Sequence, residues 1–171
     1  MSAINGVVVG LVTNVNDPKQ LGRIKVHFPW LDASHETDWI RIATLMAGAD
    51  RGSFFMPEVD DEVLLAFEHA DTRFPVAIGF LWNGKDKPPA KHVRDRILKS
   101  KNGHTNRFLD STPSRGDMGA LVIEDAHKNR ITLSNGQVRI QSKGRLVIDG
   151  ASIVLMVGGV PRVVAQNRNP I

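Results

Sequence analysis

DPKQLGRIKVHFPWL, residues 17–31, joins a turn to a strand with one buried face. Asp17-Pro18 starts the turn, because proline fixes its own φ and lacks the amide hydrogen that a sheet ladder needs. Polar and apolar residues then alternate along Arg23, Ile24, Lys25, Val26, His27 and Phe28. A period of two is typical of a strand that packs one face on a core, so the stretch predicts a half-buried strand over residues 23–28.

Four other segments in the first half of the chain also have the pattern of strands. They cover residues 7–15, 39–45, 62–68 and 76–82. Five short strands can bury their edges by closing into a small barrel, and the OB-fold is the five-stranded barrel of this kind. The prediction for residues 1–90 is therefore an OB-fold barrel, with a simple two-sheet arrangement as the alternative.

The composition of the chain excludes several kinds of protein. Hydrophobic residues make up 42% of its 171 residues, which is enough for a folded core. The absence of cysteine excludes disulfide frameworks, thiolate nucleophiles and cysteine-ligated zinc. The start MSAINGVVVGLV lacks the basic segment of a secretory signal, and the longest apolar run, residues 151–161, is shorter than the ~20 residues of a membrane span. We therefore expect a soluble protein that is synthesised and assembled in the cytoplasm.

Charge divides the chain into two parts of different character. Residues 1–90 contain 8 Lys or Arg and 12 Asp or Glu, whereas residues 91–171 contain 14 and 6, so their net charges are −4 and +8. Such asymmetry favours two segments with different partners. Residues 85–96 contain Pro88-Pro89 and have no periodicity, which is typical of a linker. A domain boundary is therefore predicted there.

Short apolar pairs recur at intervals of seven or eight residues in the second half. The pairs are Ile131/Leu133, Val138/Ile140, Leu146/Ile148 and Ile153/Leu155. Glycines recur between them, at Gly136, Gly144, Gly150 and Gly158. A strand of about three residues followed by a turn, repeated in this way, is the pattern of a β-helical solenoid.

A single chain of such short strands is too thin to enclose its own apolar residues. Burial of the eight aliphatic side chains in the pairs is worth about 12–24 kcal/mol before the entropy of ordering is subtracted. One chain alone would forfeit much of this free energy and leave open strand edges. Three identical chains around a common axis would bury the side chains and close the edges. The sequence therefore predicts a homotrimer with these eight residues packed on its axis.

Several long motifs resemble a known family. DP-x-x-x-GRIKVHFPWL, at residues 17–31, is similar to the OB-fold module of phage baseplate assembly protein V, of phage central spike proteins and of the VgrG spike proteins of type VI secretion. The similarity continues through Ala47-Gly48, PEVDDEVLLAFEHAD at residues 57–71 and FPVAIGFLWNGKDKPP at residues 74–89. ILKSKNGH, at residues 97–104, resembles the family's passage from barrel to β-helix.

The resemblance implies a structural spike of a contractile phage tail or a phage-tail-like injection system. The fold would be all-β, with an N-terminal five-stranded OB-fold barrel followed by a C-terminal intertwined triple-stranded β-helix. Because the chain begins at the barrel, three barrels would form a collar on a separate hub protein. The β-helix would be a rigid needle that meets the target membrane mechanically, and a PAAR-like tip protein would complete its end.

The same resemblance assigns a role to each segment. Residues 1–90 would be the barrel, residues 91–120 a linker leading into the shaft, residues 121–158 the shaft and residues 159–171 the tip segment. The tip protein would dock where the repeat is interrupted, at Gly158, Gly159, Val160 and Pro161. The sequence departs from the family at Asp60 and Ala70, where relatives commonly have glycine.

No catalytic, metal or cofactor site is predicted. The acidic residues within 58–62 follow Pro57, so a solvated turn explains them better than acid–base chemistry. Ser100 and His104 do not form a recognisable nucleophile motif. The six histidines are scattered, without the spacing of metal ligands. We expect a protein that is not an enzyme.

Binding of single-stranded nucleic acid is the alternative function, because OB-folds use stacking aromatics and a basic groove for it. The residues available for this are Phe28, Trp30, Trp39 and Phe80 for stacking, and Arg23, Lys25 and His27 for positive charge. The net charge of −4 on residues 1–90 opposes attraction to phosphate, so the spike interpretation is favoured and no nucleic-acid partner is expected.

Overall fold

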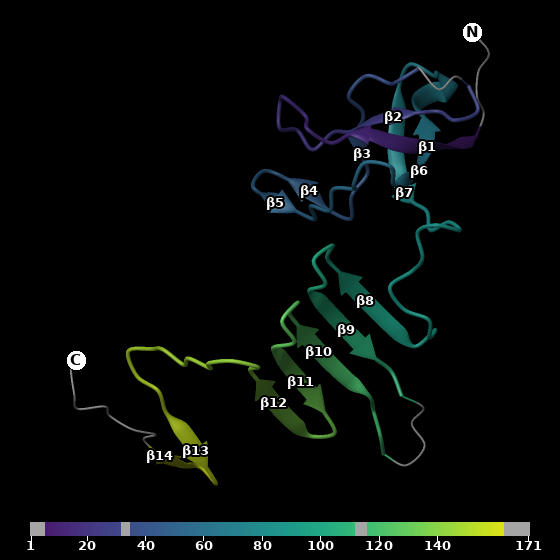
Figure 1. Cartoon of the computed structure of the whole chain (residues 1–171). Coiled ribbons are helices and arrows are strands. Elements are labelled where there is room, and N and C mark those ends of the chain that lie inside the picture. Colours follow the sequence, from purple (N-terminus) through teal and green to yellow (C-terminus); the bar gives the residue numbers. More distant parts are fainter. Residues whose placement is uncertain (1–5, 32–34, 112–115, 163–171) are drawn as a thin grey trace. The chain divides into compact units, whose positions relative to one another are not determined.

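The computed structural model describes residues 6–31, 35–111 and 116–162, and the chain divides into two compact units (Figure 1). Unit 1 is Met1–Pro88 and unit 2 is Pro89–Ile171, so the division falls between the two prolines of the predicted linker. The predicted all-β class is confirmed, since the described residues contain a single helical element, the short 3₁₀ turn η1 (Glu68–Ala70). None of the described helical structure is long enough to cross a membrane.

Unit 1 is built on one curled sheet of five strands, in the order β2-β1-β6-β7-β3. The strands are β1 (Val7–Asn14), β2 (Lys25–His27), β3 (Arg41–Ile42), β6 (Glu62–Phe67) and β7 (Pro75–Phe80). Neighbours are antiparallel except for the parallel pair of β3 and β7. All five predicted strands are present, with bounds that differ from the predicted ones by a few residues, and the arrangement is consistent with the predicted OB-fold. The hairpin of β4 (Ala47–Gly48) and β5 (Arg51–Gly52) was not predicted.

The core of unit 1 follows from the alternation in β2 and its neighbours. Ile24 and Val26 are fully buried and Phe28 is nearly so, as the period of two predicts. The other buried members of this core are Val12, Ile40, Val63, Leu65 and Ala77. Side chains from all five strands or their flanks therefore meet inside the curled sheet.

Asp60 and Ala70, the two positions at which the resemblance predicts glycine, adopt a backbone conformation that suits glycine. Asp60 has a φ of 75° and Ala70 a φ of 59°. Side chains other than that of glycine are strained in this left-handed region, because Cβ crowds the following carbonyl oxygen. The turn before β6 and the turn before β7 thus form despite the departures, at some cost in backbone strain.

Replacing Ala70 by glycine is expected to stabilise unit 1 by about 0.5–1 kcal/mol, because relief of the left-handed strain exceeds the added entropy of the unfolded chain. Urea unfolding followed by tryptophan fluorescence measures this change, since Trp30, Trp39 and Trp82 all belong to unit 1. Ala66→Gly is the matched control, because Ala66 lies inside β6 and glycine there loses stability. A decrease of similar size in both variants would contradict the strain argument.

Unit 2 contains an antiparallel meander in the order β12-β11-β10-β9-β8 (Figure 1). Its strands are β8 (Asp95–Lys99), β9 (Thr105–Leu109), β10 (Ala120–Glu124), β11 (Arg130–Ser134) and β12 (Gln137–Gln141). Residues 91–120, assigned from the sequence to a linker leading into the shaft, carry β8, β9 and the first residue of β10. The strands have five residues rather than the three that the repeat predicts.

Residues 142–154 contain no strand within the chain, although the repeat places Leu146/Ile148 and Ile153 there. Beyond them, β13 (Leu155–Val157) and β14 (Val160–Arg162) form a hairpin that is separate from the meander. Its turn is Gly158-Gly159, with φ values of 59° and 78°. Two consecutive positive φ angles are typical of a type I′ hairpin turn, which explains the glycine pair.

Candidate functional site

One face of the meander in unit 2 is apolar. Residues directly opposite each other on neighbouring strands share a face, so the register groups the side chains. Leu121 lies opposite both Phe108 and Leu133, and Leu133 lies opposite Val138. A second row has Ile123, Ile131 and Ile140 opposite one another. With Leu98 at the β8 end, the large side chains of this apolar face are Leu98, Phe108, Leu121, Ile123, Ile131, Leu133, Val138 and Ile140. The register also places Arg96 and Asn106 on this face, at its β8–β9 end.

No part of the described chain covers the apolar face. Apart from the partly buried Leu121, its side chains are between 38% and 67% exposed. Val122, on the opposite face, is the only buried hydrophobic residue described in unit 2, whereas unit 1 has eight. A unit of this size with almost no interior of its own is unusual for a soluble domain, and an apolar surface of this extent marks an interaction site.

The structure brings four of the eight predicted axis residues together. Ile131, Leu133, Val138 and Ile140 are neighbours on the apolar face. Leu146, Ile148 and Ile153 lie outside any strand of the chain, Leu155 lies in β13, and all four are exposed. The other four residues of the apolar face were not predicted. ALVIE, at residues 120–124, is a run of four apolar residues and a glutamate, so it marks a strand but does not show which face carries Leu121 and Ile123.

The opposite face of the meander is mostly polar. Thr132 of β11 lies opposite Arg139 of β12. Arg107 of β9 forms an ion pair with Asp95 of β8 at 3.3 Å. The meander is therefore amphipathic, with one face suited to water and one suited to a partner.

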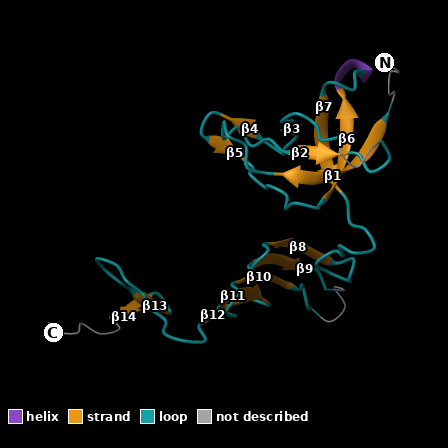
Figure 2. Ribbon diagram, turned by 45° about the horizontal axis from the view of Figure 1, so that its top comes forward, coloured by secondary structure: helices purple, strands orange, loops and turns teal. Residues whose placement is uncertain are grey.

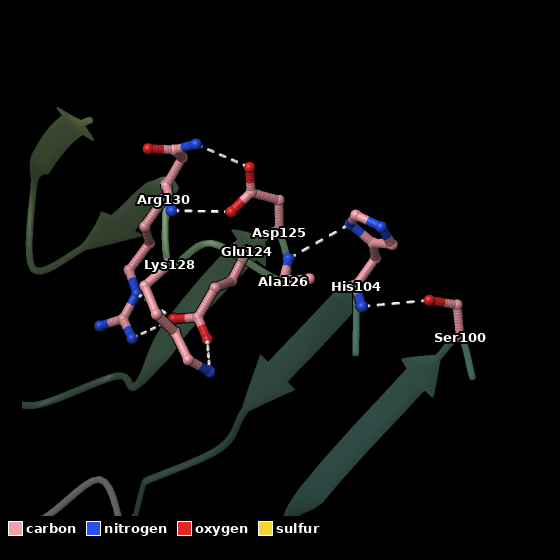
Figure 3. Close-up of polar contacts among 8 residues, drawn as sticks. Ser100, His104, Glu124, Asp125, Ala126, Lys128 and Arg130 are labelled. Atoms are coloured by element: carbon pink, nitrogen blue, oxygen red, sulfur yellow. Dashed lines mark hydrogen bonds and ion pairs between the residues drawn. The ribbon is translucent and has the colours of Figure 1, made fainter. Parts of the chain in front are cut away.

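A polar network fixes one end of the meander (Figure 3). The Lys128 ammonium donates to Glu124 at 3.0 Å, and the Arg130 guanidinium donates to the same carboxylate from Nε at 2.7 Å. Asn129 donates to Asp125 from its backbone and side-chain nitrogens, at 2.8 and 2.7 Å. Lys128 and Arg130 lower the pKa of Glu124, and the side-chain hydrogen bond from Asn129 lowers the pKa of Asp125. Both carboxylates thus stay ionised and hold the turn between β10 and β11.

Ser100 and His104 belong to this network as structural residues. The His104 amide donates to Ser100 Oγ at 3.0 Å, and the Ala126 amide donates to His104 Nδ1 at 3.3 Å (Figure 3). Each side chain therefore binds backbone, and the pair joins the β8–β9 turn to the β10–β11 turn. A nucleophile and its base would instead contact each other through their side chains.

The acidic run before β6 also stabilises a turn. Asp61 Oδ2 accepts a hydrogen bond from the Glu58 amide at 2.8 Å, and Glu62 accepts one from Asn83 Nδ2 at 3.0 Å. Within the described ranges, no three histidine, aspartate or glutamate side chains gather as a metal site would require.

Arg23 and Lys25, two of the three cationic residues suggested for nucleic-acid binding, already form ion pairs within the chain. The Arg23 guanidinium binds Asp17, and Lys25 Nζ lies 2.7 Å from Glu36 Oε2 and 5.6 Å from the centre of the Trp39 ring. Phe28, one of the suggested stacking residues, is buried in the core. Two of the three suggested cations and one of the four suggested rings are therefore engaged within the chain, and the nucleic-acid alternative is not favoured.

Asp17 and Arg23 explain the motif DP-x-x-x-GR. Arg23 donates to the Asp17 carboxylate from Nε and Nη2 at 2.9 and 2.7 Å, and the amides of Lys19 and Leu21 donate to it at 3.0 and 2.9 Å. Gly22 supplies a φ of 67° between them. The Asp17 side chain is only 3% exposed. The motif is thus a closed turn that leads into β2.

Asp17→Asn is expected to lower the melting temperature of unit 1 by more than about 5 °C at pH 7, because the turn loses its ionic bonds. Arg23 holds the pKa of Asp17 well below its ordinary value, so the stabilisation is complete above about pH 4 and is lost as pH falls further. The difference between the two proteins should therefore shrink as the pH falls from about 4 to about 2. Thermal unfolding followed by tryptophan fluorescence checks this, and a constant difference across that range would contradict it.

The predicted tip-docking residues lie together on the β13–β14 hairpin. Gly158 and Gly159 form its turn, and Val160 and Pro161 are in β14, where Pro161 pairs with Met156 and Val160 with Val157. Residues 163–171, the remainder of the predicted tip segment, lie outside the described residues.

Comparison with known proteins shows similarity of unit 1 to the OB domain of injection machines. Residues 8–82 match the model of the type VI secretion system/phage-baseplate injector OB domain. Over 83 residues, 46% of this chain, the sequence is 36% identical to the type VI secretion system spike protein VgrG2a of Pseudomonas aeruginosa. It is 31% identical over 87 residues, 47% of this chain, to the actin cross-linking toxin VgrG1 of Vibrio cholerae. These matches confirm the resemblance to VgrG-type spike proteins.

The extent of the matches differs between relatives. The two matches span 10% and 8% of the length of those relatives. The spike protein VgrG5 of Pseudomonas aeruginosa is 29% identical over 126 residues, which is 70% of this chain and 15% of the relative. A match of that length cannot be contained in Met1–Pro88, so the similarity to VgrG5 continues into unit 2.

Proposed function

We propose that this chain is a structural spike protein of a type VI secretion system or a phage baseplate. The premise is that residues 8–82 belong to the injector OB-domain family of these machines. Three copies associate through unit 2 into a rigid shaft, and their barrels form a collar. The role is mechanical, and the toxin activity in the name of the Vibrio relative is a property of that protein.

The uncovered apolar face of unit 2 carries this proposal. Apart from the partly buried Leu121, its large side chains have no cover within the described chain, and β12 leaves one sheet edge free there. A closed threefold arrangement covers three such faces with one another and removes the free edges. The exposed aliphatic side chains within residues 142–154 support the same assembly, because strands of an intertwined shaft pair with other copies rather than with their own chain.

The finer parts of the proposal extend the role of VgrG-type spike proteins to this chain. The barrel end contacts a separate hub or baseplate protein, and the shaft pierces the target envelope when the machine contracts. A PAAR-like tip protein docks on the β13–β14 hairpin, with Gly158, Gly159, Val160 and Pro161 at the contact. The hairpin supports this role because its tight glycine turn ends the run of exposed aliphatic residues. The protein is synthesised in the cytoplasm and assembled into the baseplate there.

Sedimentation velocity of the full chain at micromolar concentration tests the proposal. The expected result is one elongated species with three times the 18.8 kDa mass of the chain. A compact, well-folded monomer would remove the basis for the shaft, and with it the spike function.

A further inference from the structure

A second apolar surface lies in unit 1. Residues 44–56, here called the arm, contain the β4–β5 hairpin and carry Leu45, Met46, Phe54 and Phe55. Phe54 is 77% exposed and Leu45 is 93% exposed. A monomeric surface seldom presents so many large apolar side chains on one short segment, so the arm has the character of an interaction surface.

The arm has a defined conformation. Its two sides are joined by hydrogen bonds from the Ser53 amide to the Met46 carbonyl at 2.9 Å and from Thr44 Oγ1 to the Ser53 carbonyl at 2.7 Å. Gly52 has a φ of 151°, and a Cβ there would lie 2.5 Å from the Met46 carbonyl oxygen. Because the hairpin closes on itself in this way, Phe54 and Phe55 are held in place at its base and little ordering entropy is lost when they bind.

A groove at the other end of β7 matches the arm in chemistry. This receiving groove has a volume of about 760 Å³ and is lined by aromatic and aliphatic side chains that include Trp30, Trp39, Phe74 and Val76. Trp30 and Phe74 are each 54% exposed. Clefts of roughly 300–1,000 Å³ with apolar walls are of the size that accepts a few large side chains.

The arm of one copy cannot reach its own receiving groove. The groove is lined by Pro75 and Val76 at the start of β7, whereas Ile78, Gly79 and Phe80 at its end line the hollow beside the arm. The η1 turn and the β4–β5 hairpin accordingly lie at opposite ends of unit 1 (Figure 2). Two unlike surfaces on opposite sides of a subunit are what a head-to-tail ring requires, because each copy donates one surface and receives with the other.

Charge also favours this pairing. Arg51 at the tip of the arm and Asp38 in the wall of the receiving groove are both solvent-accessible. Neither forms an ion pair within the described ranges of the chain, although other charges around the groove do, as Arg41 with Glu68 and Arg73 with Asp71. A contact between copies would give both groups a partner.

We propose that in the trimer the arm of each copy seats Phe54 and Phe55 in the receiving groove of the next copy, with Arg51 beside Asp38. The inference rests on the proposed function, which supplies the threefold assembly. The contact area is small, since two phenylalanine rings contribute ~150–250 Å² each against about 800 Å² per partner in a typical stable interface. The contact therefore does not hold the trimer together by itself; it locks the barrels into a collar once the shaft has brought them close.

Crosslinking of the full chain tests this contact, because the protein has no cysteine of its own. Ser53→Cys places a thiol on the arm, and Thr72→Cys places one in the wall of the receiving groove, while all the aromatic side chains remain. A short bismaleimide should join the double variant into a covalent trimer on a denaturing gel. Either single variant should stay uncrosslinked.

Two further variants test the chemistry of the contact. Adding Phe54→Ala and Phe55→Ala to the double-cysteine protein should slow crosslinking about tenfold, which corresponds to ~1.4 kcal/mol, while the sedimenting mass stays that of three chains. Arg51→Glu should also slow it, and Asp38→Arg combined with Arg51→Glu should restore the rate.

The possible outcomes separate this inference from the proposed function. A trimer that does not crosslink, or that crosslinks as well without Phe54 and Phe55, overturns the arm contact and leaves the spike function intact; the arm would then face another protein such as the hub. Crosslinking of Ser53→Cys alone also overturns it, because the arms would then meet one another. A monomer in sedimentation overturns both proposals.

Discussion

Ile131→Asp combined with Ile140→Asp is expected to convert the trimer into monomers at micromolar concentration. The two residues lie directly opposite each other on β11 and β12, at the β12 edge of the apolar face. In a closed threefold shaft the change places six carboxylates in an apolar interior. Transfer of an ionised carboxylate into such surroundings costs several kcal/mol unless it is paired, and the nearest partners would be other carboxylates. We expect the association to weaken by at least ~1,000-fold, or about 4 kcal/mol.

The control for this prediction is on the same two strands. Thr132 and Arg139 are also directly opposite each other, but on the polar face of the meander. Thr132→Asp combined with Arg139→Asp introduces the same two carboxylates one residue away, where water can solvate them, and should leave the trimer intact. Sedimentation velocity distinguishes the two variants. Equal loss of the trimer in both, or a stable trimer of the variant with both isoleucines replaced, would show that the apolar face is not the axis.

A separate readout shows whether unit 1 remains folded in these variants. The three tryptophans of the chain, Trp30, Trp39 and Trp82, all lie within Met1–Pro88. Their fluorescence therefore reports on unit 1. Because Trp30 and Trp39 line the receiving groove, which empties when the trimer dissociates, their emission spectrum is expected to change even in a folded barrel. A cooperative thermal transition of this fluorescence together with a monomeric mass assigns the effect to the shaft.

The sequence predicts unit 1 better than unit 2, and the difference has a physical cause. The strands of the barrel bury one face within their own chain, so the alternation of Ile24, Val26 and Phe28 is enough to find both the strand and its core face. Asp17 and Gly22 further mark the preceding turn, because each satisfies a backbone requirement that few residues meet. The β4–β5 hairpin gave no such signal, since strands of two residues are too short to show a period.

In unit 2 the same kind of pattern has a different outcome. Val138 and Ile140 alternate with polar residues as a buried strand does, and they form β12, yet they remain exposed in the single chain. Leu146 and Ile148 are spaced in the same way and form no strand at all. Hydrophobic periodicity predicts that a segment will bury one face, but it does not say whether the cover comes from its own chain. The mismatch between pattern and burial is therefore the feature that points to assembly.

Gly119→Ala is expected to destabilise the meander of unit 2. Among the glycine-to-alanine substitutions at the described glycines of this unit, it should have the largest effect. Gly119 immediately precedes β10 and has a φ of 82°. A Cβ at this position would overlap the carbonyl oxygen of Leu109 and lie 2.9 Å from its carbonyl carbon and 3.0 Å from the amide nitrogen of Ser111. All three are backbone atoms, so no change of side-chain rotamer relieves the overlap, and β9 and β10 must separate at the point where Leu109 pairs with Ala120.

Gly103→Ala isolates this steric effect from the cost of the backbone angle. Gly103 also has a positive φ, 93°, but an added Cβ would meet nothing within 4 Å. It should therefore lose only the ~1–2 kcal/mol of left-handed strain, whereas Gly119→Ala should lose about 3 kcal/mol or more. Thermal unfolding followed by far-ultraviolet circular dichroism measures both at one protein concentration, which matters because the stability of an oligomer depends on it. Similar losses in the two variants would mean that the close approach of β10 to Leu109 does not determine the stability of unit 2, and the shaft would then owe its stability to the contacts between chains alone.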